Sequence, residues 1–279
     1  MLADYHMHLE NGPLTVEYIA QFVEVAQARG VTEVGISEHC HHFVEYRRIM
    51  EHLATGPGTY RELDEFFSQC FHTPIAEYID VLNQARQAGL PIKIGIEVDY
   101  IPGFEREIAE FIAGQEWDYV LGSVHYLGKW AIDFSPDLGW QERDVDQVYE
   151  EYFSTLQQAA RSGLFDVITH PDLVKIFGHR PGIALDRIYA ETAASMAEGG
   201  VCCEVSAAGI RKPVGEIYPA RELLAECQRR NVPITFSSDA HYPQEAGENL
   251  HQAVAFAKSC GYTQAATFTA RQMTLYPLD

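Results

Sequence analysis

Short apolar runs alternate along the chain with longer amphipathic segments, and this pattern predicts strands and helices in turn. The apolar runs, rich in β-branched residues, predict strands at residues 3–8, 33–37, 92–97, 119–123, 167–170, 201–206 and 234–238. Helical periodicity is clearest at residues 16–28, 75–88, 145–161 and 185–198, and each of these segments is followed closely by glycine. A regular βαβα order favours a parallel sheet, and this number of units favours a barrel.

Two segments interrupt the alternation, residues 40–73 and residues 126–144. Both are rich in aromatic and charged residues, and both directly follow a predicted strand. Loops at the C-terminal ends of barrel strands are where active sites are built. Since no internal repeat or linker-like stretch divides the chain, we expect one α/β domain over residues 1–279 with these two insertions.

Composition narrows the classes of protein that the chain could represent. The first residues contain no apolar signal core, and the six cysteines form no CxxC pair, so we expect a cytoplasmic protein with reduced thiols. With 40 acidic and 20 basic side chains, the formal net charge is −20. Such a charge repels a phosphate backbone, so we expect no nucleic-acid partner, and no membrane-spanning stretch is present. The sequence does not indicate an oligomeric state.

Histidines and carboxylates gather at the predicted strand ends. The residues in these positions are His6, His8, His39, Glu97, His125, His170, Asp239 and His241. In a barrel the strand ends converge on one rim, so side chains that are distant in sequence come together there. His6 and His8 point to the same face because side chains alternate along a strand. Imidazole and carboxylate groups suit zinc, iron and manganese, and we therefore predict a metal site.

The same motifs resemble those of the polymerase and histidinol phosphatase family, almost from end to end. The matching motifs are DYHMH at residues 4–8, EH at 38–39, GIE at 95–97 and SDAH at 238–241. Two longer strings, residues 170–181 and 207–219, are similar to the histidinol-phosphatase branch of that family. The resemblance implies a single distorted (β/α)7 TIM-like barrel with its active site at the C-terminal ends of the strands.

The resemblance also implies three divalent metal ions, with zinc, manganese and iron as the family's occupants. The first ion would take His6, His8, Glu97 and Asp239. Glu97 would bridge to a second ion, which would also take His125 and His170, and the third would take His39 and His241. Many relatives carry a further histidine where this chain has Leu14. Glu10 is our candidate replacement, and the alternative is that Glu10 is an ordinary turn residue.

A metal cluster of this kind suits phosphate ester hydrolysis, because it can acidify water and neutralise phosphoryl oxygens. We expect Glu97, Asp239 and His241 to serve catalysis, with Asp239 or a rim histidine donating a proton to the leaving group. Arg211 and Lys175 are our candidates for binding the substrate phosphate. The alternative for both is ordinary pairing with neighbouring acids.

The resemblance implies a metal-dependent phosphomonoesterase that hydrolyses L-histidinol phosphate to L-histidinol and phosphate in histidine biosynthesis. The aromatic and acidic insertion at residues 40–73 could close over the imidazole and ammonium groups of that substrate. One alternative is a phosphoesterase acting on nucleotides or another small phosphate. Two others are a noncatalytic metal-binding module and a metal-dependent deaminase or amidohydrolase on the same barrel.

Overall fold

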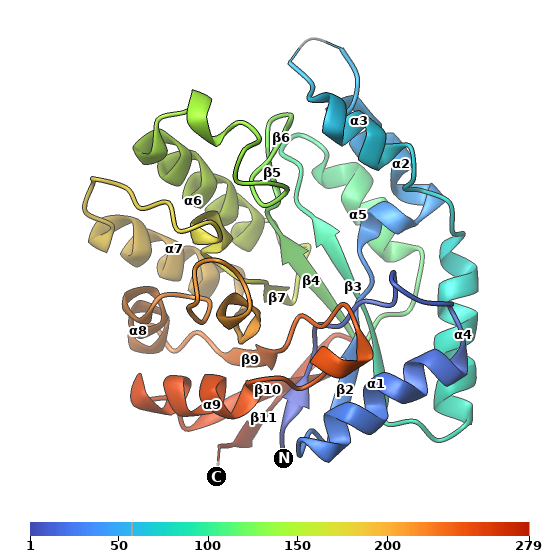
Figure 1. The fold of residues 1–279 in the computed structure, drawn as a ribbon. Coiled ribbons are helices and arrows are strands. Elements are labelled where there is room, and N and C mark those ends of the chain that lie inside the picture. The colour runs from blue at the N-terminus through green and yellow to red at the C-terminus, as the bar shows by residue number, and fades with distance from the viewer. Residues whose placement is uncertain (57, 279) are drawn as a thin grey trace.

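The computed structural model describes residues 1–56 and 58–278, and these residues form the predicted α/β barrel (Figure 1). Seven parallel strands lie in one sheet in the order β1-β2-β3-β4-β7-β8-β9. They are β1 (Ala3–Asp4), β2 (Glu33–Ile36), β3 (Ile92–Asp99), β4 (Tyr119–Ser123), β7 (Val167–Ile168), β8 (Cys202–Ser206) and β9 (Ile234–Ser237). The order follows the chain because each connection crosses over to the next parallel strand. The predicted fold class is confirmed.

The first and last strands meet and bring the sheet close to a closed barrel. Tyr5 N donates to Phe236 O at 3.2 Å, and His8 N donates to Ala240 O at 2.8 Å. Met7 and Ala240 form an isolated parallel bridge. The first strand is therefore shorter than residues 3–8, because beyond Asp4 the chain pairs only intermittently while it carries His6 and His8 into the rim.

Helices surround the barrel and bury their apolar faces against it (Figure 1). The longer ones are α1 (Val16–Ala28), α4 (Ile75–Gln87), α5 (Glu105–Ala113), α6 (Val145–Arg161), α7 (Asp186–Gly199), α8 (Arg221–Arg229) and α9 (Leu250–Ser259). Helix α1 begins after Thr15 and α6 after Asp144, whose side chains accept hydrogen bonds from backbone N–H groups of the first turn. The predicted bounds at 16–28 and 145–161 therefore match these two helices.

The two insertions contain short elements and lie at the end of the barrel away from the chain termini (Figure 1). Residues 40–73 form a 3-10 turn at Cys40–His42 and the helices α2 (Arg47–Met50) and α3 (Arg61–Phe67), among other turns. Residues 126–144 form a hairpin of β5 (Tyr126–Leu127) and β6 (Trp130–Ala131), followed by the 3-10 turn Trp140–Glu142. We propose that residues 1–279 form one domain and that both insertions are part of it.

Aromatic rings fill the barrel interior below the rim, and a C-terminal hairpin covers it. Tyr5 and Tyr119 are fully buried, with ring centroids 4.8 Å apart. The antiparallel strands β10 (Gln264–Thr269) and β11 (Gln272–Pro277) place Phe268 against them, and Phe268 N donates to the Tyr5 hydroxyl at 3.0 Å. This hairpin is absent from the sequence-based prediction. It lies beside the N-terminus in Figure 1, at the end opposite the insertions.

A search of the helices in residues 1–56 and 58–278 for candidate bilayer crossings finds none with the required length and apolar character.

Candidate metal centre

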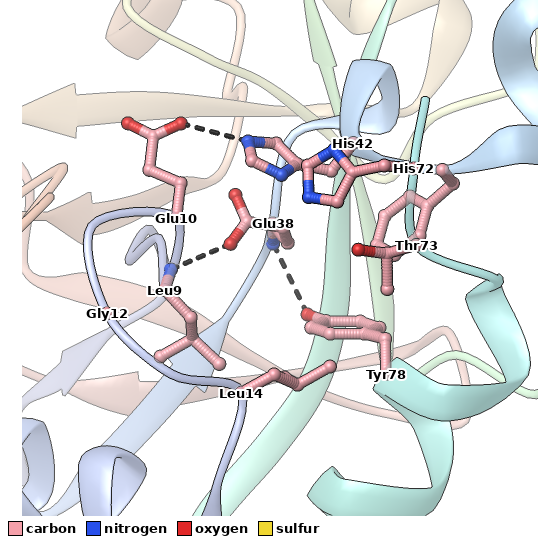
Figure 2. A pocket seen from close by; sticks show the side chains of 10 residues that line it. Leu9, Glu10, Gly12, Leu14, Glu38, His42, His72, Thr73 and Tyr78 are labelled. Atoms are coloured by element: carbon pink, nitrogen blue, oxygen red, sulfur yellow. Dashed lines mark hydrogen bonds and ion pairs between the residues drawn. The ribbon is translucent and has the colours of Figure 1, made fainter. Parts of the chain in front are cut away.

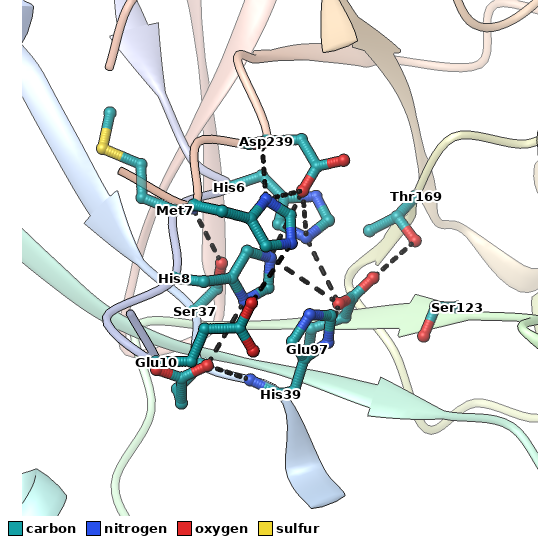
Figure 3. A network of polar contacts seen from close by, with 12 residues as sticks. His6, Met7, His8, Glu10, Ser37, His39, Glu97, Ser123, Thr169 and Asp239 are labelled. Carbon is teal, nitrogen blue, oxygen red and sulfur yellow. Dashed lines mark hydrogen bonds and ion pairs between the residues drawn. The ribbon is translucent and has the colours of Figure 1, made fainter. Parts of the chain in front are cut away.

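The predicted ligands converge on the rim at the C-terminal ends of the strands, and Figure 3 labels His6, His8, Glu10, His39, Glu97 and Asp239 among them. They arrive from six of the seven strands or from the residues that directly follow them. The chain places His6 and His8 after β1, His39 after β2, Glu97 in β3, His125 after β4, His170 after β7, and Asp239 and His241 after β9. The parallel barrel therefore gathers the predicted set into one polar cluster.

Glu97 lies at the middle of this cluster, and its two carboxylate oxygens face different histidines. Oε2 lies 3.4 Å from His6 Nε2 and 3.8 Å from His8 Nε2. Oε1 lies 3.1 Å from His170 Nε2 and 3.8 Å from His125 Nε2. One carboxylate thus separates two groups of imidazole nitrogens, as a bridging ligand between two cations would.

Asp239 completes the group around His6 and His8. Its Oδ1 lies 3.3 Å from His8 Nε2 and 3.7 Å from His6 Nε2. Asp239 and His170 both have left-handed backbone, with φ of +50° and +25°. Non-glycine residues seldom adopt this region, and such strain is often retained where it aims a functional side chain. The backbone at both positions therefore supports a functional constraint.

His39 lies between the Glu97 group and the outer histidines. Its Nδ1 is 2.7 Å from Glu97 Oε2, and its ring stacks on His8 with centroids 3.9 Å apart. His8, His39 and His241 each present a ring nitrogen within 4.8 Å of the others. The structure thus brings His39 near both the first predicted group and His241.

Glu10 lies beside His241, whereas Leu14 lies apart from it. The Glu10 carboxylate is 3.7 Å from His241 Nε2 through Oε1 and 3.2 Å from His42 Nε2 through Oε2. A cavity of about 200 Å³ adjoins them, and Figure 2 shows Leu14 and Tyr78 at its floor, away from the Glu10 carboxylate. His42 therefore lies at the rim beside Glu10.

Several buried polar atoms of the cluster have no hydrogen-bond partner among the described residues. They include His6 Nε2, both ring nitrogens of His8, and His170 Nδ1. Buried polar atoms in folded proteins are nearly always satisfied, so these atoms are suited to a ligand. Nitrogen and carboxylate donors at such spacing fit a divalent cation of the zinc, manganese or iron type.

The charges around Glu97 keep it ionised. Burial alone would raise its pKa, but the nearby imidazoles of His6, His39 and His125 outweigh burial and hold the pKa well below its usual range. The pKa of Asp239 is lowered in the same way, against burial, chiefly by His6 and His8. Both carboxylates are therefore in the charged form that binds metal.

Three buried carboxylates orient the histidines, and the sequence-based prediction missed all of them. Glu204 lies 2.8 Å from His6 Nδ1, and Asp99 lies 2.7 Å from His125 Nδ1. Glu38 Oε1 lies 3.5 Å from His8 Nδ1 and also accepts from the backbone N–H of His39 at 2.9 Å. Such outer carboxylates fix the ring and tautomer of metal-binding histidines. Glu204 is an acidic residue inside an apolar strand, and this feature of the sequence could have identified it as a partner of a metal-binding histidine.

The two predicted phosphate-binding residues have different surroundings. Arg211 Nη2 donates to the carbonyl oxygens of Ser238 and Asp239, while its Nη1 has no hydrogen-bond partner among the described residues. The guanidinium also pairs at longer distance with two acids, Glu245 at 3.8 Å and Glu248 at 3.6 Å. Arg211 and His241 line one cavity of about 280 Å³. Lys175 is buried, and its ammonium lies 2.9 Å from Asp172 and donates to Ile217 O at 3.0 Å.

The chain is similar to known proteins in family, sequence and fold. The model of the PHP domain matches residues 4–208. A probable histidinol-phosphatase of Deinococcus radiodurans is 40% identical over 205 residues, covering 71% of this chain and 77% of that protein. The histidinol-phosphatase of Bacillus subtilis is 25% identical over 277 residues, covering 92% of this chain and 98% of that one.

A solved structure shares the fold along nearly the whole chain. Histidinol phosphate phosphatase of Lactococcus lactis, in complex with zinc, L-histidinol and phosphate, aligns with a TM-score of 0.76 at 22% identity, covering 98% of each chain. The family model covers most of this chain, and the Deinococcus relative exceeds the identity that unrelated proteins show. The chain belongs to the PHP family, the polymerase and histidinol phosphatase family, and within it to the histidinol-phosphatase branch.

Proposed function

We propose that this protein is a metal-dependent phosphomonoesterase that hydrolyses L-histidinol phosphate to L-histidinol and phosphate. The observation that carries the proposal is the position of Glu97, whose two oxygens face separate groups of histidine nitrogens. The names of the Deinococcus and Bacillus relatives support the substrate. So do the zinc, L-histidinol and phosphate bound by the Lactococcus protein. We also propose that the protein acts in the cytoplasm, on a small-molecule phosphate ester.

We assign three ion positions to the cluster. His6, His8, Asp239 and Glu97 Oε2 would hold the first, and Glu97 Oε1, His125 and His170 the second. The third would be held by His39, His241 and Glu10. Glu10 is favoured over a simple turn role because its carboxylate reaches to within 3.7 Å of His241 Nε2. Zinc, manganese and iron all suit these donors.

Bound divalent ions would supply positive charge to the phosphoryl oxygens and make water acidic enough to attack at neutral pH. Arg211, which lines one cavity with His241, would hold a phosphoryl oxygen, and its Nη1 would exchange only a 3.6 Å ion pair with Glu248 for the phosphate. Lys175 remains our second phosphate candidate, and to reach phosphate its ammonium must exchange Asp172 or Ile217 for the substrate. Arg211 therefore carries more of the phosphate binding in this proposal.

Protonation of the leaving oxygen needs an acid at the rim. Asp239 and His241 are the two candidates, since both border the Arg211 side of the cluster. Burial, followed by the charge of His8, lowers the pKa of His241 to about 4, so the free imidazole is neutral near pH 7. A neutral His241 is in the form that binds an ion. The ionised Asp239 is therefore the group that would accept the proton of the attacking water and pass it to the leaving oxygen.

The test is phosphate release from L-histidinol phosphate compared with a panel of nucleotides and sugar phosphates. Protein loaded with zinc or manganese is compared with chelated protein. We expect a strong preference for L-histidinol phosphate that is lost on chelation. Equal turnover of the whole panel would overturn the substrate assignment, and turnover that survives chelation would overturn the metal chemistry.

A further inference from the structure

Besides the cavity of about 200 Å³ beside Glu10 and His42, two cavities adjoin the metal centre, and their charges differ. The Arg211 cavity is bordered by two basic side chains, Arg211 and Lys212, with one acid, Glu245, and by His241. The second, which we call the acidic cavity, has a volume of about 270 Å³ and is lined by Glu10, Asp99 and Asp133 among aromatic and histidine rings. No lysine or arginine occurs among its lining residues in the described part of the chain. The first therefore suits an anion, and the second suits a cation.

We propose that the acidic cavity binds the leaving-group end of the substrate, and that Asp133 selects a positively charged alcohol. This inference rests on the proposed function, because it gives the alcohol half of the phosphate ester a place. The cavity borders His39 and His125, which belong to the metal centre. A group in the cavity is therefore next to a phosphate held between the metals and Arg211.

Asp133 is the carboxylate of the cavity that is available to a ligand. Asp99 is engaged with His125 Nδ1 at 2.7 Å, and Glu10 lies 3.2 Å from His42 Nε2. The nearest ion-pair partner of Asp133 is His125 Nε2, at the long distance of 4.0 Å. Within residues 1–56 and 58–278, no ion pair joins Asp133 to a lysine or arginine. Its side chain is 29% exposed, so a ligand can reach it from the cavity.

Aromatic rings form a wall beside Asp133. Phe134 is 42% exposed although it is large and apolar, and its ring lies edge-on to Phe66 at a centroid distance of 5.7 Å. Phe66 in turn lies edge-on to His41 at 5.1 Å. Aromatic faces next to a carboxylate suit a cationic or planar aromatic group, and the imidazole and ammonium of histidinol offer both. The small volume suits a ligand of that size.

The two insertions build this cavity together. His41 and Phe66 come from residues 40–73, whereas Tyr126, Asp133 and Phe134 come from residues 126–144. The barrel strands supply the metal ligands, and the insertions supply the selective contacts. Such a division is common in barrel enzymes, whose loops set the substrate while the strands fix the chemistry.

Binding of L-histidinol, which lacks phosphate, tests the inference directly. Titration calorimetry would compare the metal-loaded wild type with Asp133→Asn, Asp133→Glu and the control Asp137→Asn. Asp137 is an exposed carboxylate four residues further along the same insertion. We expect Asp133→Asn to weaken binding about tenfold, as for a partly exposed pair of opposite charges. Asp133→Glu should retain most of the affinity, and Asp137→Asn all of it.

Kinetics separate this inference from the proposed function. In Asp133→Asn, the ratio of kcat/KM for L-histidinol phosphate to kcat/KM for phenyl phosphate should fall about tenfold, mainly through KM. An unchanged ratio and unchanged L-histidinol affinity would overturn the role of Asp133 alone. If the wild type binds L-histidinol through Asp133 but releases no phosphate from its ester, the proposed function fails and the cavity assignment stands. If the wild type neither binds L-histidinol nor hydrolyses its phosphate, both fail.

Discussion

Replacing Glu204 with glutamine would change the hydrogen bonding of the metal centre while leaving the volume of the side chain almost the same. Glu204 is fully buried, and its Oε1 lies 2.8 Å from His6 Nδ1 while Oε2 accepts from His170 N at 2.7 Å. Glutamine has a single acceptor oxygen. Its NH2 group must therefore face either the His170 N–H, donor against donor, or His6 Nδ1. In the second case the proton of His6 moves to Nε2, the atom that faces Glu97 and Asp239.

Either arrangement weakens the site by a predictable amount. A buried donor left without an acceptor costs about 1–3 kcal/mol of unfolding free energy. Loss of an outer-sphere partner of a metal-binding histidine typically lowers metal affinity or activity by roughly 10–100-fold. We expect both effects in Glu204→Gln. Competition with a chromogenic chelator measures the metal affinity, and thermal unfolding of the chelated protein measures the cost to stability.

Glu198→Gln provides the matched control. Glu198 belongs to α7 and pairs with Arg161 on the surface at 2.6 Å, with more than half of its side chain exposed. An exposed pair contributes little, so this variant should bind metal as the wild type does. The reasoning about Glu204 would be refuted by a folded Glu204→Gln protein whose metal affinity and turnover equal those of the wild type.

Three further predictions follow from single contacts. A Cβ on Gly95 would lie 2.2 Å from the buried Tyr119 ring, so Gly95→Ala should lower the unfolding free energy by about 1–3 kcal/mol; an unchanged urea midpoint would contradict this. Burial, and then the charge of Glu10, raises the pKa of the Cys70 thiol to about 12, so the neutral thiol persists below that pH. The thiolate fraction of Cys70 near pH 8 is then on the order of 10⁻⁴. Alkylation of Cys70 in the native protein should therefore be slow, and its rate should rise with pH. Alkylation of the native protein as fast as that of the urea-unfolded protein would disprove the buried site. Arg211→Ala should raise the inhibition constant of inorganic phosphate about 10–100-fold, with Arg211→Lys between the two, and equal inhibition of all three proteins would remove Arg211 from the phosphate site.

The strand order and the rim were predictable because both depend on local patterns. Buried parallel strands need continuous apolar runs, and their C-terminal ends share one rim, so a histidine at each end is informative without knowledge of any contact. Glu97 was predicted to lie in the cluster because it falls at the C-terminal end of a predicted strand. That its two oxygens face opposite groups of histidines depends on the twist of the barrel, which sequence spacing does not contain.

Other features were missed for identifiable physical reasons. The β10–β11 hairpin has a largely exposed second strand, so it lacks the apolar run that marked the barrel strands. Glu204 and Asp99 are single acids within or at the end of strands, and only the fold shows that each lies beside a histidine from another strand. The role of Lys175 at the phosphate stays a prediction, and the fold adds a contact that its motif does not contain, because Asp172 lies 2.9 Å from its ammonium.

The central claim is that ions held around Glu97 enable hydrolysis of L-histidinol phosphate. The most direct measurement titrates zinc or manganese into chelated protein and follows, in the same samples, bound metal per chain and phosphate release. The account predicts that activity returns as the ions bind, and that Glu97→Gln binds fewer ions and stays inactive at any metal concentration. Full activity of the chelated wild type, or of metal-loaded Glu97→Gln, would contradict it.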